Sequence, residues 1–148
     1  MQNPKPILLV EDDRVDAMAV QRIARELKIP NQLVLKTDGE EALEYLKNDT
    51  ARPCVILLDI NMPKMNGIEM LKIIKADDTL KNIPVVFVLS LKEDVERVKN
   101  LNLGAAYISK PVSRNNLSET LKAVGLDITS GESSNNKFWG DTLVCKKD

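Results

Sequence analysis

The sequence predicts a doubly wound α/β domain built on a five-stranded parallel sheet. Short apolar runs alternate with helical patterns throughout residues 5–124, as expected for successive βα units. The runs at 54–58 and 85–89 are apolar without alternation, so both faces of these strands are expected to be covered. Right-handed crossovers would then place helices on both faces of the sheet.

Each expected element has its own local signal. Strands are predicted by short apolar runs, which lie at residues 6–10, 33–36, 54–58, 85–89 and 105–109. Helices are predicted where apolar residues recur at helical spacing. These residues are Val20, Ile23, Ala24 and Leu27, then Ala42, Leu43 and Leu46, then Ile68, Leu71 and Ile74, then Val95, Val98 and Leu101, and finally Leu117, Leu121 and Val124. Pro30 follows the first helix, and the fourth helix is expected to end near Gly104.

The composition excludes several classes of function. The chain has 148 residues, a net charge of −1 and no histidine, so Ser-His catalysis, Cys-His catalysis and ordinary zinc sites lack their residues. Cys54 and Cys145 form no CxxC pair, and the mixed charge argues against binding to a nucleic-acid backbone. No apolar run approaches the roughly 18 residues of a membrane span, and the first residues lack the apolar stretch of a signal peptide. We therefore expect a reduced, cytoplasmic protein that makes no membrane contact.

One domain is expected over residues 1–125, followed by a C-terminal extension over 126–148. The helical pattern fails from Gly125, and residues 129–137 are rich in Ser, Asn and Gly, which predicts a linker. Phe138 and Trp139 then begin a late apolar patch. Burial of two such rings is strongly favourable, so we expect them to pack against protein.

Polar side chains stand where the predicted strands end, and ligands of doubly wound sheets bind beyond those ends. The residues are Glu11, Asp12 and Asp13 after the first strand, Asp59 after the third, Ser90 after the fourth and Lys110 after the fifth. An acidic triplet alone is most often a helix N-cap, and a single strand-end aspartate or lysine is most often solvated. Their occurrence together at the ends of one sheet favours a functional site.

The charges at these strand ends predict a metal-dependent phosphoryl site. Clustered carboxylates repel one another, and Mg²⁺ relieves the repulsion because it prefers oxygen ligands. Lys110 adds a positive charge that offsets the remaining carboxylate, so a dianionic phosphoryl group could approach. No activated serine is evident, so the candidate nucleophile is Asp59, which a buried central strand would hold in place.

Four segments resemble the receiver domain of two-component response regulators. They are residues 7–13 (ILLVEDD), 57–67 (LLDINMPKMNG), 83–86 (IPVV) and 104–111 (GAAYISKP). They occur in the family's order within residues 5–124. The resemblance implies the CheY-like strand order 2-1-3-4-5.

The resemblance also implies roles for the residues that match the acidic site. Asp59 would accept a phosphoryl group from a phosphohistidine on a sensor histidine kinase, which must be another chain because this one lacks histidine. Mg²⁺ would be held by the carboxylates of Glu11, Asp12 and Asp59 and by the backbone carbonyl of Asn61. The phosphorylated chain would signal through altered protein contacts, and it would have only weak autodephosphorylating activity.

Two further matches lie on and after the fifth strand. Lys110 would contact the phosphoryl group, and the Lys110–Pro111 peptide bond would be cis. Tyr107 stands at the family's aromatic switch position.

One departure from the family concerns the switch hydroxyl. Counting from Asp59 or from Pro84 places Leu89 where the family has Thr or Ser, and Ser90 is the next residue. The spacing back from Lys110 is shorter than usual, which indicates an insertion or deletion within 89–110. Either Ser90 supplies the hydroxyl through a bulge, or no hydroxyl follows the phosphoryl group and the switch is altered.

Only a short segment follows the last helix, so the chain resembles single-domain regulators that act through protein contacts. It resembles in particular those paired with bacterial phytochrome-type kinases. In these regulators an aromatic pair beyond the last helix takes part in dimer contacts. Phe138 and Trp139 either play that part in a homodimer or fold back on their own domain.

Three other functions share parts of this pattern. A phosphohydrolase would use the same aspartyl-phosphate chemistry, but it needs a general acid near the nucleophile, and Asn61 stands where an aspartate commonly supplies it. Leu89 leaves open a third function, a binding scaffold whose output does not depend on phosphorylation. A flavodoxin-like electron carrier shares the architecture, but 3% aromatic residues leave little to stack on a flavin.

Overall fold

The computed structural model describes residues 5–48, 52–101, 103 and 105–126, and within these residues five strands alternate with five helices. The strands are β1 (Ile7–Val10), β2 (Leu33–Lys36), β3 (Val55–Asp59), β4 (Val85–Leu89) and β5 (Ala106–Ser109). The helices are α1 (Arg14–Glu26), α2 (Gly39–Asn48), α3 (Gly67–Ala76), α4 (Lys92–Leu101) and α5 (Arg114–Ala123). None of these helices is long and apolar enough to cross a bilayer.

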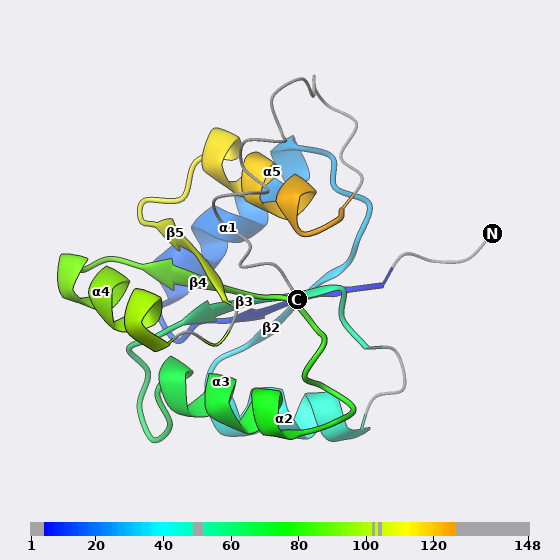
Figure 1. Cartoon of the computed structure of the whole chain (residues 1–148). Coiled ribbons are helices and arrows are strands. Elements are labelled where there is room, and N and C mark those ends of the chain that lie inside the picture. Colours follow the sequence, from blue (N-terminus) through cyan, green and yellow to red (C-terminus); the bar gives the residue numbers. More distant parts are fainter. Residues whose placement is uncertain (1–4, 49–51, 102, 104, 127–148) are drawn as a thin grey trace.

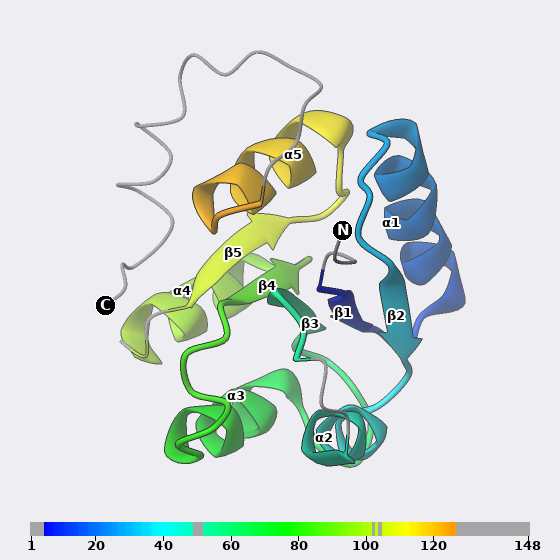
Figure 2. The same cartoon turned by 90° about the vertical axis from the view of Figure 1, so that its right-hand side faces the viewer.

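The strands form one parallel sheet in the order β2-β1-β3-β4-β5, which confirms the predicted fold class. Helices α1 and α5 cover one face, and α2, α3 and α4 lie on the other (Figures 1 and 2). Every residue of β3 and β4 is buried, because apolar side chains of both strands enter the cores on both faces. This two-sided burial explains why their sequences do not alternate.

The central position of β3 fixes the place of its last residue. The strand pairs with β1 on one side and β4 on the other, and Asp59 lies opposite Val88 of β4. The chain then turns back sharply, because the Gly67 N–H donates to the Ile60 carbonyl at 2.9 Å. A Cβ atom at Gly67 would stand 2.4 Å from the Asp59 carbonyl oxygen, so only glycine fits there.

The element boundaries differ from the sequence-based ones by a few residues. Strand β3 begins at Val55 and includes Asp59, whereas we expected it to span 54–58. Helix α4 ends at Leu101 rather than near Gly104, and β5 begins at Ala106. The last described residue is Leu126, so the expected linker, the pair Phe138-Trp139 and the second cysteine lie outside the described residues.

Candidate functional site

Three carboxylates meet beyond the carboxyl ends of β1 and β3. Glu11 and Asp12 follow β1, and Asp59 ends β3. Each offers a carboxylate oxygen, and these three oxygens all lie within 4.8 Å of one another. Glu11 is 3% exposed and Asp59 is 7% exposed, whereas Asp12 is open to solvent. The topology therefore brings together the acidic residues that the strand-end pattern singled out.

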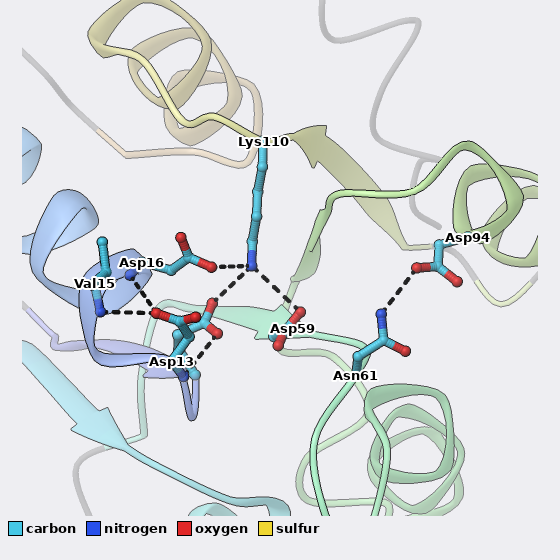
Figure 3. Close-up of polar contacts among 8 residues, drawn as sticks. Asp13, Val15, Asp16, Asp59, Asn61, Asp94 and Lys110 are labelled. Atoms are coloured by element: carbon cyan, nitrogen blue, oxygen red, sulfur yellow. Dashed lines mark hydrogen bonds and ion pairs between the residues drawn. The ribbon is translucent and has the colours of Figure 1, made fainter.

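Lys110 enters the same site from the end of β5, and the backbone of the neighbouring strand holds it there. The Lys110 N–H donates to the Leu89 carbonyl at 2.6 Å, and the Lys110–Pro111 peptide bond is cis, as expected. The ammonium Nζ lies 3.4 Å from Glu11 Oε1. It also lies 3.7 Å from Asp59 Oδ1 (Figure 3). The lysine side chain is only 16% exposed, so these ion pairs are poorly screened by water.

The nearest partner of the lysine is a residue that sequence reasoning missed. Lys110 Nζ donates to Asp16 Oδ2 at 2.7 Å, so a fourth carboxylate stands beside the three expected ones (Figure 3). Asp16 reaches the site from the first turn of α1. A cleft of about 160 Å³ opens beside this ion pair, between α1 and the segment after β5. Its lining includes Glu11, Asp16, Lys110 and Pro111.

The acidic triplet after β1 divides into two functions. The Asp13 carboxylate accepts from the backbone N–H groups of Val15 and Asp16 at 2.9 and 3.1 Å and caps α1. The N-cap interpretation is therefore correct for Asp13. Glu11 and Asp12 face the cluster instead.

The pKa values of the two buried carboxylates are raised, with burial as the largest cause. Burial and the neighbouring charge of Asp59 raise the pKa of Glu11 from 4.5 to about 7, although Lys110 opposes the rise. Burial also raises the pKa of Asp59, against the opposing charge of Lys110. Burial alone would lower the pKa of Lys110, but its hydrogen bond to Asp16 and the charges of Asp59 and Glu11 outweigh burial, and its pKa rises. The carboxylates thus outnumber the one ammonium that contacts them.

The residues present fit a hard divalent cation. Such ions take oxygen ligands from one or two carboxylates and keep several waters, and the exposed side of the cluster at Asp12 leaves space for them. The raised pKa values of Glu11 and Asp59 show that added positive charge would be favourable at this position.

Asn61, two residues after Asp59, has a side-chain partner that sequence reasoning also missed. Its Nδ2 donates to Asp94 Oδ2 at 3.2 Å (Figure 3), and Asp94 lies in the first turn of α4. Asp94 is only 3% exposed, and its Oδ1 accepts from Arg97 Nη1 at 3.2 Å. In sequence Asp94 looks like an ordinary acidic residue at a helix start, and no local signal marks it as buried.

The structure bears on the two interpretations of the missing switch hydroxyl. Strand β4 pairs with β5 in continuous register as far as Leu89 opposite Ser109, so β4 contains no bulge up to that residue. Leu89 is buried in the core, and Ser90 is exposed just after the strand. Any role for the Ser90 hydroxyl would therefore come from the loop. Tyr107 is half-buried and packs against the core that α4 shares with β4.

The fold and this site define a class of signalling domain. Residues 7–122 match the family model of the response regulator receiver domain. The chain therefore belongs to the response regulator receiver family of two-component signalling.

Among individual relatives, the chain is similar to the response regulator Rcp1 of Synechocystis sp. The two are 35% identical, over 95% of this chain and 92% of Rcp1. A structure of Rcp1 in its Mn²⁺-bound form aligns with a TM-score of 0.69 at 30% identity, over 88% of this chain and 99% of that one.

Two solved phytochrome regulators are also similar. The bacteriophytochrome response regulator RtBRR aligns with a TM-score of 0.79 at 32% identity, over 92% of this chain and 87% of that one. The phosphorylated cyanobacterial phytochrome response regulator RcpA aligns with a TM-score of 0.70 at 33% identity, over 88% of this chain and 97% of that one.

Proposed function

We propose that Asp59 is the phosphoacceptor of a two-component response regulator that works with Mg²⁺. The observation that carries the proposal is the meeting of Asp59 with Glu11, Asp12 and Lys110 at the carboxyl ends of the strands. The donor is a phosphohistidine on a sensor histidine kinase, and it belongs to another chain because this one contains no histidine.

The chain's own residues supply the parts of an in-line phosphoryl transfer. A carboxylate oxygen of Asp59 attacks the phosphorus atom, the new P–O bond forms, and the P–N bond to the donor imidazole breaks. Lys110 leaves Asp16 and places its ammonium against a phosphoryl oxygen, where it offsets the transferred negative charge. Burial at the end of β3 keeps the attacking oxygen in a fixed position.

Mg²⁺ would be held by Glu11, Asp12 and Asp59, together with the backbone carbonyl of Asn61. When bound, it neutralises the carboxylate cluster and orients the phosphoryl oxygens. Because burial raises the pKa of Asp59, the added positive charge also favours the ionised form that acts as nucleophile.

Loss of the phosphoryl group by self-catalysed hydrolysis would be slow. Hydrolysis of a metabolite phosphate ester needs a general acid for the departing alkoxide, and Asn61, two residues after the nucleophile, cannot supply one. The activity is therefore that of a switch, and turnover of metabolite phosphate esters is not expected.

The kinase partner we propose is of the bacterial phytochrome type, acting in the cytoplasm. The similarity to RtBRR and RcpA over most of the chain supports this choice. We assign residues 1–125 to the receiver domain and 126–148 to an extension that either contributes to a homodimer or folds back on its own domain. Sedimentation of the full chain and of a chain that ends at Leu126, each with and without phosphorylation, tests the dimer. A dimer that survives truncation would contradict the role of the extension.

A scaffold that binds its partner regardless of phosphorylation is the second candidate. Buried Leu89 favours it, because the strand offers no hydroxyl to follow the phosphoryl group. Equal partner affinity for wild type and Asp59→Asn would select this candidate.

Intact-mass spectrometry after incubation with acetyl phosphate tests the primary proposal. Wild type should gain the mass of one phosphoryl group with Mg²⁺ present, and the gain should disappear with a chelator or in Asp59→Asn. Asp78→Asn, which alters an exposed aspartate, is the matched control and should react like wild type. A wild-type chain that stays unmodified, or an Asp59→Asn chain that reacts equally, would overturn the proposal.

A further inference from the structure

Asn61 makes one contact with the acceptor site and another with a distant helix. Its backbone N–H acts on the Asp59 carboxylate and opposes the rise of that group's pKa. Its side-chain amide donates to Asp94 of α4 at 3.2 Å, a residue 33 positions further along the chain (Figure 3). One residue therefore touches both the phosphoacceptor and the helix that packs beside β4.

Helix α4 buries few of its side chains. Asp94 and Val98 are its only buried residues, and the rest of the helix is half-buried or exposed. A buried carboxylate is costly unless it is hydrogen-bonded, and Asp94 has Asn61 on one oxygen and Arg97 on the other. Arg97 belongs to α4 itself, so Asn61 is the partner that joins this carboxylate to the phosphoacceptor loop.

Strand β4 itself offers no hydroxyl that could follow the phosphoryl group toward α4. Leu89, its last residue, is a buried apolar side chain, and the exposed Ser90 comes after the strand. The Asn61–Asp94 hydrogen bond bypasses β4, because it runs directly from the loop after β3 to the first turn of α4.

We propose that Asp94 is a positioning residue that holds the Asn61 side chain and thereby couples the phosphoacceptor loop to α4. A dianionic phosphoryl group on Asp59 draws the Asn61 amide toward its oxygens, and the buried Asp94 loses its donor from the loop. The start of α4 then loosens, which changes the surface that α4 offers to partners. This inference rests on the proposed phosphorylation of Asp59.

Amide hydrogen exchange in α4, with and without Mg²⁺ and beryllofluoride as the phosphoryl mimic, tests the coupling. Fluorine NMR records occupancy of the site in each sample. In wild type, exchange in residues 92–101 should rise about fivefold on occupancy, as expected for loss of one hydrogen bond of typical net strength. In Asp94→Ala, exchange should already be fast in the free protein, and occupancy should add nothing.

Two further variants separate coupling from simple support of the helix. Arg97→Ala removes the other partner of Asp94 but keeps the link to Asn61, so it should retain the fivefold response. Asn61→Ala breaks the same link from the opposite side and should lose the response, which keeps the test valid if Asp94→Ala does not fold.

Each outcome has a distinct meaning. If Asp94→Ala or Asn61→Ala binds beryllofluoride and α4 responds as in wild type, the coupling role is wrong while the proposed function stands. The coupling role is also wrong if wild type binds the mimic and exchange in α4 does not change. If wild type fails to bind the mimic at all, the proposed function itself fails.

Discussion

Replacement of Glu11 by glutamine should stabilise the protein when no metal is bound. The Glu11 side chain is buried, and its pKa rises from 4.5 to about 7 because of burial and the charge of Asp59. The amide of Gln has the shape of the protonated carboxyl and carries no charge. The substitution therefore removes a buried charge, together with its repulsion from Asp59, without opening a cavity.

The sign and size of the effect follow from proton linkage. Because the folded state binds the Glu11 proton more tightly than the unfolded state, stability is fully present below about pH 4.5 and falls as the pH rises through about 7. Each pH unit between the two pKa values corresponds to about 1.4 kcal/mol, so Glu11 lowers the free energy of unfolding by up to about 3 kcal/mol at pH 8. The raised pKa of Asp59 acts in the same direction.

Urea unfolding followed by circular dichroism measures this effect in the presence of a chelator. At pH 8, Glu11→Gln should exceed wild type by about 1–3 kcal/mol, and the difference should shrink at pH 5. Addition of Mg²⁺ should stabilise wild type more than the variant, because the variant has lost a ligand. Glu44→Gln changes an exposed glutamate of α2 and should match wild type throughout. If Glu11→Gln is less stable than wild type at pH 8 without metal, the cluster is not under electrostatic strain and the reasoning fails.

Three other substitutions have defined outcomes. Gly67→Ala places a Cβ atom 2.4 Å from a backbone oxygen and should lower the free energy of unfolding by about 1–3 kcal/mol. Gly39→Ala meets only a flexible side chain and should lower it less. Equal losses of the two variants in urea unfolding would contradict the steric argument. Lys110→Met leaves the buried carboxylates without their cation. At pH 8 without metal it should therefore lower the free energy of unfolding by about 2–4 kcal/mol. A loss no larger than that of the surface substitution Lys99→Met would contradict the role of the buried ion pairs. Leu89→Thr removes buried apolar volume and adds a hydroxyl to the core. It should lower the free energy of unfolding by about 2–3 kcal/mol, more than Leu89→Val does, as measured by thermal or urea unfolding. A Thr variant as stable as wild type would show that this position is not packed as described.

Much of the fold could be predicted because its signals are local. The strands at 33–36 and 85–89 were predicted to the residue, since each is a short apolar run between polar or proline residues. Helix ends were less accurate, as at Leu101, because capping and loop closure depend on contacts that spacing does not record.

The candidate site could be predicted in part for a related reason. Glu11, Asp12, Asp59 and Lys110 stand at strand ends, and a parallel sheet brings such ends together regardless of the details of packing. Asp16 and Asp94 were missed because their contacts depend on how a helix is rotated against the sheet. Their partners lie 94 and 33 positions away in the chain, and both residues look like ordinary acidic residues of a first helical turn.

A crystal structure of the chain with Mg²⁺ and beryllofluoride would test the central claim most directly. The account predicts beryllium bonded to an Asp59 carboxylate oxygen and Mg²⁺ about 2.1 Å from a carboxylate oxygen of Glu11 or Asp12. The Lys110 ammonium should have moved from Asp16 to a fluorine atom. Beryllofluoride bound elsewhere, or a metal ion that ignores the acidic cluster, would contradict the assignment of Asp59 as phosphoacceptor.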